Sequence, residues 1–233
     1  MSSTNSVFKP FLVKICGLTT VDDAVCAAKA GADILGFVLV EGTPRYVDPE
    51  AFAELVSELK RTVTGASAPL IAALTVNADE SLMSAASGHA DIFQLHGDET
   101  PAQAKKIRAA FGKPVVKAIG VDGPGAFSRA IDFAGSVDAL LLDAKPATAD
   151  GPRGGTGVRF DWSYLRDFKS ELPFLLAGGL TPDNVVDAVS AAMPLPSFCG
   201  VDVSSGVEVS HGVKDTGKVS GFVAKARSAF KTV

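Results

Sequence analysis

The stretch VKICGLTTVDDAVCAAKAGADILGFVLV, residues 13–40, contains the pattern that decides the fold. It begins with a short apolar run, passes a single glycine, and then has helical spacing of apolar residues from Val21 to Ala28. Apolar residues at i, i+3, i+4 and i+7 form one face of a helix. A second apolar run follows, so the stretch predicts a strand, a helix and a strand.

The same alternation recurs along the chain. Eight apolar runs begin near residues 11, 34, 70, 92, 115, 139, 174 and 199. Runs that are apolar on both faces suit parallel strands covered by helices, and eight units predict a single (β/α)8 TIM barrel of the α/β class. An open doubly wound sheet is the alternative, but it normally has a G-x-G-x-x-G turn after its first strand, where Gly17 stands alone.

The barrel is expected to span residues 11–233, after a flexible tail at residues 1–10. The chain is 47% apolar and 21% charged, which is typical of a folded, soluble protein. No apolar run approaches the ~20 residues of a membrane-spanning helix. The tail MSSTNSVFKP lacks the apolar centre of a secretory signal.

The charge and the cysteines narrow the class of partner. A net charge of -4, without a dense Lys/Arg run, argues against nucleic acid and membrane surfaces and favours a small molecule. Cys16, Cys26 and Cys199 form no C-x-x-C pair, so they predict neither a disulfide framework nor a metal site. A reducing cytoplasm is the expected location.

Polar residues that close the apolar runs are the first candidates for function, because barrel enzymes place their chemistry at the carboxyl ends of the strands. They are Cys16, His96, Lys117, Asp143, Gly178, Gly179, Asp202, Ser204 and Ser205. His96 and Asp202 either contact a substrate or only tie down loops, and the sequence leaves both open.

Cys16 has two interpretations. A free cysteine is most often a buried structural thiol. Lys14, however, lies two residues earlier and should face the same side of the strand. Its ammonium would lower the pKa of the Cys16 thiol and make this residue a usable base or nucleophile.

Asp143 and Arg45 are candidates for an acid and a carboxylate-binding residue. Asp143 follows four apolar residues, where desolvation would keep its carboxyl protonated for use as a general acid; a loop-capping aspartate is the alternative. Arg45, in GTPRY, has the planar fork that pairs with a carboxylate, although a lone loop arginine is usually just solvated.

Glycine clusters late in the chain indicate a phosphate. They are GGTG at 154–157, GGL at 178–180 and SSG at 204–206. A single glycine pair usually marks only a turn, but three clusters at matching strand ends favour backbone N–H groups that converge on an anion. We therefore expect a phosphorylated small-molecule substrate.

Together these motifs resemble those of the phosphoribosylanthranilate isomerase family. The matching pieces are VKICGLT, GADILGFV, TPRYV, QLHGDE, LLLDAK, GGTGVRFDW, LAGGLTPDNV and GVDVSSGVE. The resemblance implies an Amadori rearrangement of N-(5-phosphoribosyl)anthranilate to 1-(2-carboxyphenylamino)-1-deoxyribulose 5-phosphate, the third step of tryptophan biosynthesis from chorismate. It implies no cofactor and no metal, and the sequence leaves open whether the enzyme is a monomer or a homodimer.

The resemblance also implies roles for individual residues. Asp143 would protonate the ribose ring oxygen as general acid, and Cys16 would remove the proton from C2 as general base. Arg45 would hold the anthranilate carboxylate, with His96 and Asp202 near the substrate. The residues implied in phosphate binding are Gly155, Thr156, Gly157, Gly178, Gly179, Ser204, Ser205 and Gly206.

Two other functions would also place phosphate-binding glycines on a barrel. The related barrel isomerase of histidine biosynthesis acts on a substrate with two phosphates, but it uses aspartates as both acid and base and has glycine cradles in both halves. Here Cys16 ends the first run, and the clusters lie only in the second half. A non-catalytic phosphosugar-binding barrel would have no need for Cys16 and Asp143 together.

Overall fold

Eight parallel strands pair in chain order and close into a barrel, because the first strand also pairs with the eighth. The computed structural model describes residues 7–8, 11–65, 68–144 and 159–231. The strands are β1 (Leu12–Cys16), β2 (Ile34–Val38), β3 (Leu70–Thr75), β4 (Ile92–Leu95), β5 (Val115–Val121), β6 (Ala139–Ala144), β7 (Phe174–Leu176) and β8 (Phe198–Val203). The predicted (β/α)8 barrel is confirmed, and each strand begins within one residue of its predicted start.

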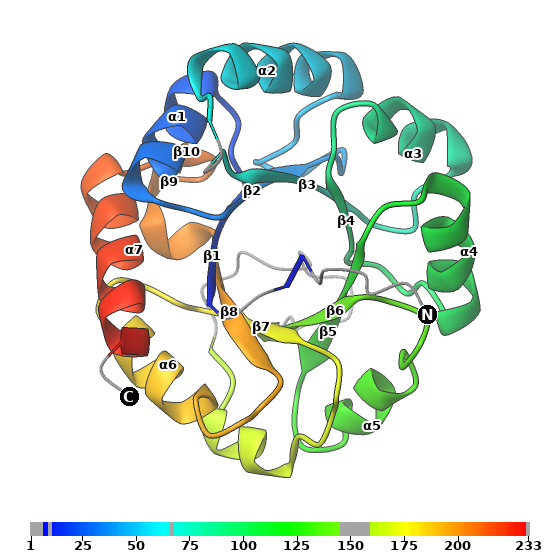
Figure 1. Ribbon diagram of the computed structural model, residues 1–233, viewed down its shortest axis with the longest axis vertical. Coiled ribbons are helices and arrows are strands. Elements are labelled where there is room, and N and C mark those ends of the chain that lie inside the picture. Colours follow the sequence, from blue (N-terminus) through cyan, green and yellow to red (C-terminus); the bar gives the residue numbers. More distant parts are fainter. Residues whose placement is uncertain (1–6, 9–10, 66–67, 145–158, 232–233) are drawn as a thin grey trace.

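Helices surround the barrel on its outside (Figure 1). They are α1 (Val21–Ala30), α2 (Pro49–Thr62), α3 (Glu80–Ser87), α4 (Pro101–Phe111), α5 (Ala126–Ile131), α6 (Val185–Ala192) and α7 (Thr216–Lys231). Between β6 and β7 the described residues form a 3₁₀ segment, η1 (Trp162–Asp167), in place of an α-helix. A 3₁₀ turn, η2 (Ser205–Val207), and a hairpin of β9 (Glu208–Ser210) and β10 (Val213–Lys214) follow β8.

Helix α1 illustrates how the local sequence sets these elements. The Thr20 hydroxyl caps its start by accepting a hydrogen bond from the Asp23 N–H at 3.2 Å. Gly31 ends it in the left-handed conformation, with φ of 94°. Ala24 and Ala27 are buried against the barrel. In the described part of the chain no helix has the length and apolar character needed to cross a membrane.

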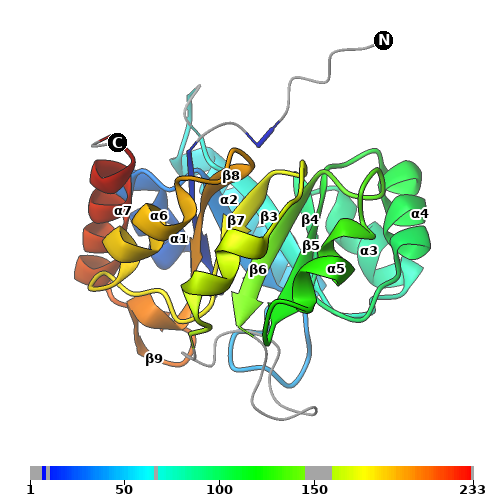
Figure 2. The same ribbon diagram turned by 90° about the horizontal axis from the view of Figure 1, so that it is seen from below.

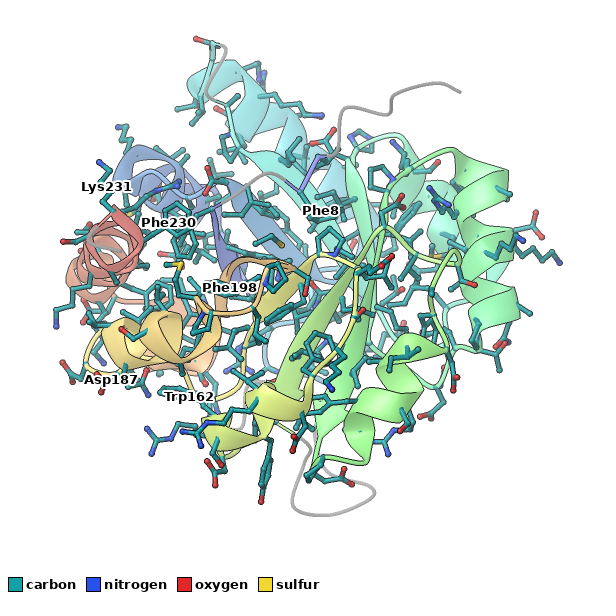
Figure 3. All side chains as sticks on the ribbon, turned by 60° about the horizontal axis from the view of Figure 1, so that its bottom comes forward. Phe8, Trp162, Asp187, Phe198, Phe230 and Lys231 are labelled. Carbon is teal, nitrogen blue, oxygen red and sulfur yellow. The ribbon has the colours of Figure 1, made fainter. Side chains whose placement is uncertain are left out.

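The amino-terminal end of the barrel is filled by apolar side chains. Residues at or near the starts of the strands, among them Leu12, Ile34 and Ile92, form one buried cluster inside the barrel, and Phe8 belongs to it with 6% of its surface exposed. Residues 7–8 lie across this opening in Figure 1, and Figure 3 shows Phe8 above Phe198 in that view. Within the segment predicted to be a flexible tail, residues 1–10, Phe8 is thus buried, which removes its apolar ring from water; residues 1–6 and 9–10 lie outside the described residues.

The carboxyl ends of the strands lie at the other end of the barrel. Figure 2 shows them at the bottom, where β9 also lies, with residues 7–8 at the top. Alternate strand residues point inward, so the last inward residue of each strand faces this end. Cys16, Asp143 and Asp202 come from such positions, and the other described residues predicted to bind substrate or phosphate follow the strands directly or in the next loop.

Candidate active site

The carboxyl ends of the strands surround a cavity of about 250 Å³. Six of the predicted site residues line it: Cys16, Arg45, His96, Asp143, Asp202 and Ser204. The other lining residues are Val38, Val40, Thr43, Pro44, Leu74, Val76 and Gln94. Residues from β1, β6, β8 and the segments after β2 and β4 thus meet around one space.

Cys16 lies beside a buried ion pair. Lys14 Nζ donates to Asp202 Oδ1 at 2.8 Å, and these residues are register partners on β1 and β8. Burial opposes the charge of Lys14, but Asp202 and Cys16 outweigh it, so the pKa of Lys14 lies above its ordinary value. Lys14 and Cys16 do face the same side of β1, as the strand period predicts.

The net effect on Cys16 differs from the sequence expectation. Burial raises the pKa of its thiol; Lys14 lowers it in part, and Asp202 raises it again, so the pKa is above its ordinary value. The prediction that Lys14 gives Cys16 a pKa below its ordinary value is therefore wrong. Burial destabilises the thiolate by more than the Lys14 ammonium stabilises it. The contribution of Lys14 alone has the expected sign.

Gly36 of β2 leaves room for the side chains of Cys16 and Lys14. It is the register partner of Cys16. A Cβ at Gly36 would lie 2.8 Å from Cys16 Sγ and 3.1 Å from Lys14 Nζ. Both side chains therefore occupy the space that a larger residue at this position would take.

Asp143 is in contact with His96. Its Oδ1 accepts a hydrogen bond from the Ala144 N–H at 2.8 Å, and its Oδ2 lies 3.4 Å from His96 Nε2. On the other side of the ring, Gln94 Nε2 lies 3.2 Å from His96 Nδ1. When Nδ1 accepts from Gln94, Nε2 carries the hydrogen and can donate it to Asp143.

Arg45 is held in a fork by a carboxylate of the chain itself. Its Nε donates to Glu208 Oε1 and its Nη2 to Glu208 Oε2, both at 2.8 Å. Lys214 Nζ also donates to Glu208 Oε1 at 2.8 Å. The Arg45–Glu208 hydrogen bonds raise the pKa of Arg45, and those from Arg45 and Lys214 overcome burial to lower the pKa of Glu208.

Two of the three glycine clusters are brought together. A Cβ at Gly206 would lie 1.8 Å from the Leu180 carbonyl oxygen, so the segments after β7 and β8 touch through backbone atoms. Gly178 and Gly179 have positive φ, at 82° and 62°. The Ser204 hydroxyl is buried and has no hydrogen-bond partner among the described residues. Gly155, Thr156 and Gly157 lie outside the described residues.

Sequence reasoning missed three polar residues of the site. Gln94 had a signal, since it interrupts an apolar run two positions before His96 and shares its face. Glu208 ends the matching piece GVDVSSGVE, but nothing local links it to Arg45, which lies 163 positions earlier. Lys214 had no signal. Lys117, which also closes an apolar run, does not line the cavity but donates to the Gly97 carbonyl at 2.8 Å.

Comparisons with known proteins agree with this architecture. The family model described as N-(5'phosphoribosyl)anthranilate (PRA) isomerase matches residues 13–225. N-(5'-phosphoribosyl)anthranilate isomerase from Rhodospirillum rubrum is 42% identical over 219 residues, covering 93% of this chain and 97% of the relative. The crystal structure of phosphoribosyl anthranilate isomerase from Thermotoga maritima has a TM-score of 0.77 at 32% identity, covering 94% of this chain and 99% of that one. A structure of such an enzyme in complex with reduced 1-(o-carboxyphenylamino)-1-deoxyribulose 5-phosphate has a TM-score of 0.75 at 31% identity, covering 94% and 99%.

Proposed function

Because this chain belongs to the N-(5'-phosphoribosyl)anthranilate isomerase family, it is an isomerase of tryptophan biosynthesis, and we propose that Cys16 and Asp143 perform its reaction. The enzyme converts N-(5-phosphoribosyl)anthranilate to 1-(2-carboxyphenylamino)-1-deoxyribulose 5-phosphate. The observation that carries the proposal is that these two side chains, from β1 and β6, line one cavity. The rearrangement consists of proton transfers, for which one acid and one base suffice, so no cofactor or metal is included.

Asp143 acts first, as the general acid. It gives its proton to the ribose ring oxygen, the C1–O bond breaks, and the anthranilate nitrogen forms a Schiff base with C1. The Cys16 thiolate then removes the proton from C2, giving an enolamine. Proton uptake at C1 and loss from the C2 hydroxyl yield the ketone of the product. A positioned acid or base typically contributes ~10²–10⁴-fold to such a step.

The surroundings of both groups support these roles. A positively charged Schiff base in the cavity would favour the thiolate of Cys16, because an opposite charge stabilises the ionised form. This offsets the burial that raises the pKa of Cys16 in the site without substrate. Once Asp143 has given up its proton, its carboxylate can accept a hydrogen bond from His96 Nε2, 3.4 Å away.

The two ends of the substrate are assigned to different groups of residues. Arg45 pairs with the anthranilate carboxylate, and His96 and Asp202 contact the sugar between the ends. Gly178, Gly179, Ser204, Ser205 and Gly206 bind the phosphate, with Gly155, Thr156 and Gly157 completing this group. The buried, unpartnered hydroxyl of Ser204 supports the phosphate assignment, because a buried polar group normally finds a partner.

The test follows the loss of anthranilate-type fluorescence as substrate is consumed. Cys16→Ser and Asp143→Asn should each lower kcat by at least ~10²-fold, since each loses one positioned proton-transfer group. Cys26→Ser is the matched control, because Cys26 lies on α1 and does not line the cavity. Near-normal turnover by both site variants would refute the assignment.

Location and assembly belong to the same proposal. We place the enzyme in the cytoplasm, acting on its small-molecule substrate as a monomer or homodimer without nucleic acid or membrane partners. The free thiols of Cys16, Cys26 and Cys199 suit a reducing compartment. A similar structure, at a TM-score of 0.75 and 31% identity, is of monomers generated from the dimeric Thermotoga maritima enzyme. Analytical ultracentrifugation over a range of concentrations distinguishes monomer from homodimer.

A further inference from the structure

We propose that Glu208 is a positioning residue that fixes the orientation of the Arg45 guanidinium toward the substrate carboxylate, and that Lys214 ties Glu208 to the segment carrying Ser204. This inference rests on the proposed function of Arg45. It adds a residue that touches no part of the substrate and acts only through its neighbour.

The geometry leaves one side of Arg45 available to a ligand. Nε and Nη2 are engaged by the two oxygens of Glu208, each at 2.8 Å. Within the described residues Nη1 makes no hydrogen bond, and Arg45 lines the cavity. A guanidinium is planar, so fixing one edge also fixes the direction of the donors on the other edge.

Glu208 is itself held firmly. Lys214 Nζ donates to Glu208 Oε1 at 2.8 Å and to the Ser204 carbonyl oxygen at 3.1 Å. Lys218 Nζ donates to the Glu208 carbonyl oxygen at 2.9 Å. Arg45, Glu208 and Lys214 are 9%, 7% and 5% exposed, so water competes little for these bonds.

The chain of contacts therefore ties Arg45 to the segment that carries Ser204. The side chains of Arg45 and Ser204 are close neighbours, because a Cβ at Gly17 would clash with both of them. The links through Glu208 and Lys214 hold the guanidinium in a fixed direction beside this segment. A substrate whose carboxylate meets the guanidinium in this direction binds without first ordering the arginine.

Simple charge counting predicts the opposite effect for Glu208. Removing a carboxylate from a site that binds an anion makes the site more positive and should tighten binding. Positioning predicts weaker binding, because the released guanidinium must be ordered again by the substrate. The sign of the change in KM therefore separates the two accounts.

The test compares Glu208→Gln, which removes the charge, with Glu208→Asp, which keeps the charge but shortens its reach. Both should raise KM about tenfold, or about 1.4 kcal/mol, with kcat changed less than about twofold. Asp33→Asn is the matched control, because Asp33 pairs with Arg227 and lies outside the cavity. Circular dichroism and thermal unfolding verify that each variant is folded. An unchanged or lowered KM in Glu208→Asp overturns the inference.

A double-mutant cycle with Arg45→Ala excludes a merely structural role for Glu208. If Glu208 acts through Arg45, adding Glu208→Gln to Arg45→Ala leaves KM where Arg45→Ala alone puts it. Equal factors in both backgrounds contradict the inference. If Arg45→Ala does not raise KM at all, the proposed function of Arg45 fails instead, so the two failures are distinguishable.

Discussion

At the scale of the residue, the environment of Cys16 is set by three charged neighbours. Lys14 and Lys214 lower the pKa of its thiol, whereas Asp202 and above all burial raise it. Burial and Asp202 thus disfavour the thiolate more than the two lysines favour it.

Replacing Lys14 with methionine should raise the pKa of Cys16 further. Lys14→Met removes a lowering charge and leaves Asp202 unpaired, and both changes disfavour the thiolate. Alkylation of Cys16 by iodoacetamide, followed by mass spectrometry across pH, should show its midpoint at higher pH than in the wild type. Because a raised pKa means that the thiol stays protonated to higher pH, the rate at any given pH below the midpoint should be lower. A midpoint that stays in place or falls would contradict this account.

At the scale of the element, the parallel pairing of β1 with β2 places Gly36, which has no side chain, opposite Cys16. Gly36 stands in a strand where glycine weakens β-structure, and its use is explained by the volume it leaves to Cys16 and Lys14. The positions of these side chains are therefore properties of two strands in register.

Gly36→Ala should consequently damage catalysis more than stability. Its Cβ would lie 2.8 Å from Cys16 Sγ, so the thiol must shift, and a misplacement of about 1 Å can cost ~10²-fold in rate. We expect kcat to fall about 10- to 100-fold in the fluorescence assay. Gly221→Ala is the control, because nothing lies within 4 Å of its Cβ and alanine favours its helix. Wild-type kcat in Gly36→Ala would disprove the steric explanation.

At the scale of the whole molecule, the two ends of the barrel serve different purposes. The amino-terminal end is filled by an apolar cluster that includes Phe8, and the carboxyl end carries the cavity with the charged and polar candidate residues. Substitutions at one end should therefore leave the property of the other end intact.

Phe8→Ala should lower stability without changing activity. Truncating a buried phenylalanine costs about 3 kcal/mol, which corresponds to a Tm lower by roughly 6–12 °C for a chain of this size. Differential scanning calorimetry measures the Tm, and kcat/KM should stay within about twofold of wild type. Val209→Ala, an exposed apolar truncation, should leave the Tm unchanged. An unchanged Tm in Phe8→Ala would mean that its ring contributes little to the core.

Much of this molecule could be predicted from local patterns. The strand starts followed from apolar runs, and the meeting of Cys16 with Asp143 followed from the rule that strand ends share one face of a barrel. The fork between Arg45 and Glu208 could not be predicted, because it joins residues 163 positions apart. The raised pKa of Cys16 could not be predicted either, because the burial that raises it depends on packing that no local pattern encodes.

The pairing of β1 with β8 has a consequence for how the enzyme is made. Lys14 and Asp202 are 188 positions apart, yet they share one ion pair beside Cys16. The ribosome therefore synthesises Cys16 early and Asp202 near the end of the chain. No nascent or truncated chain that lacks β8 can form this ion pair or close the ring of strands.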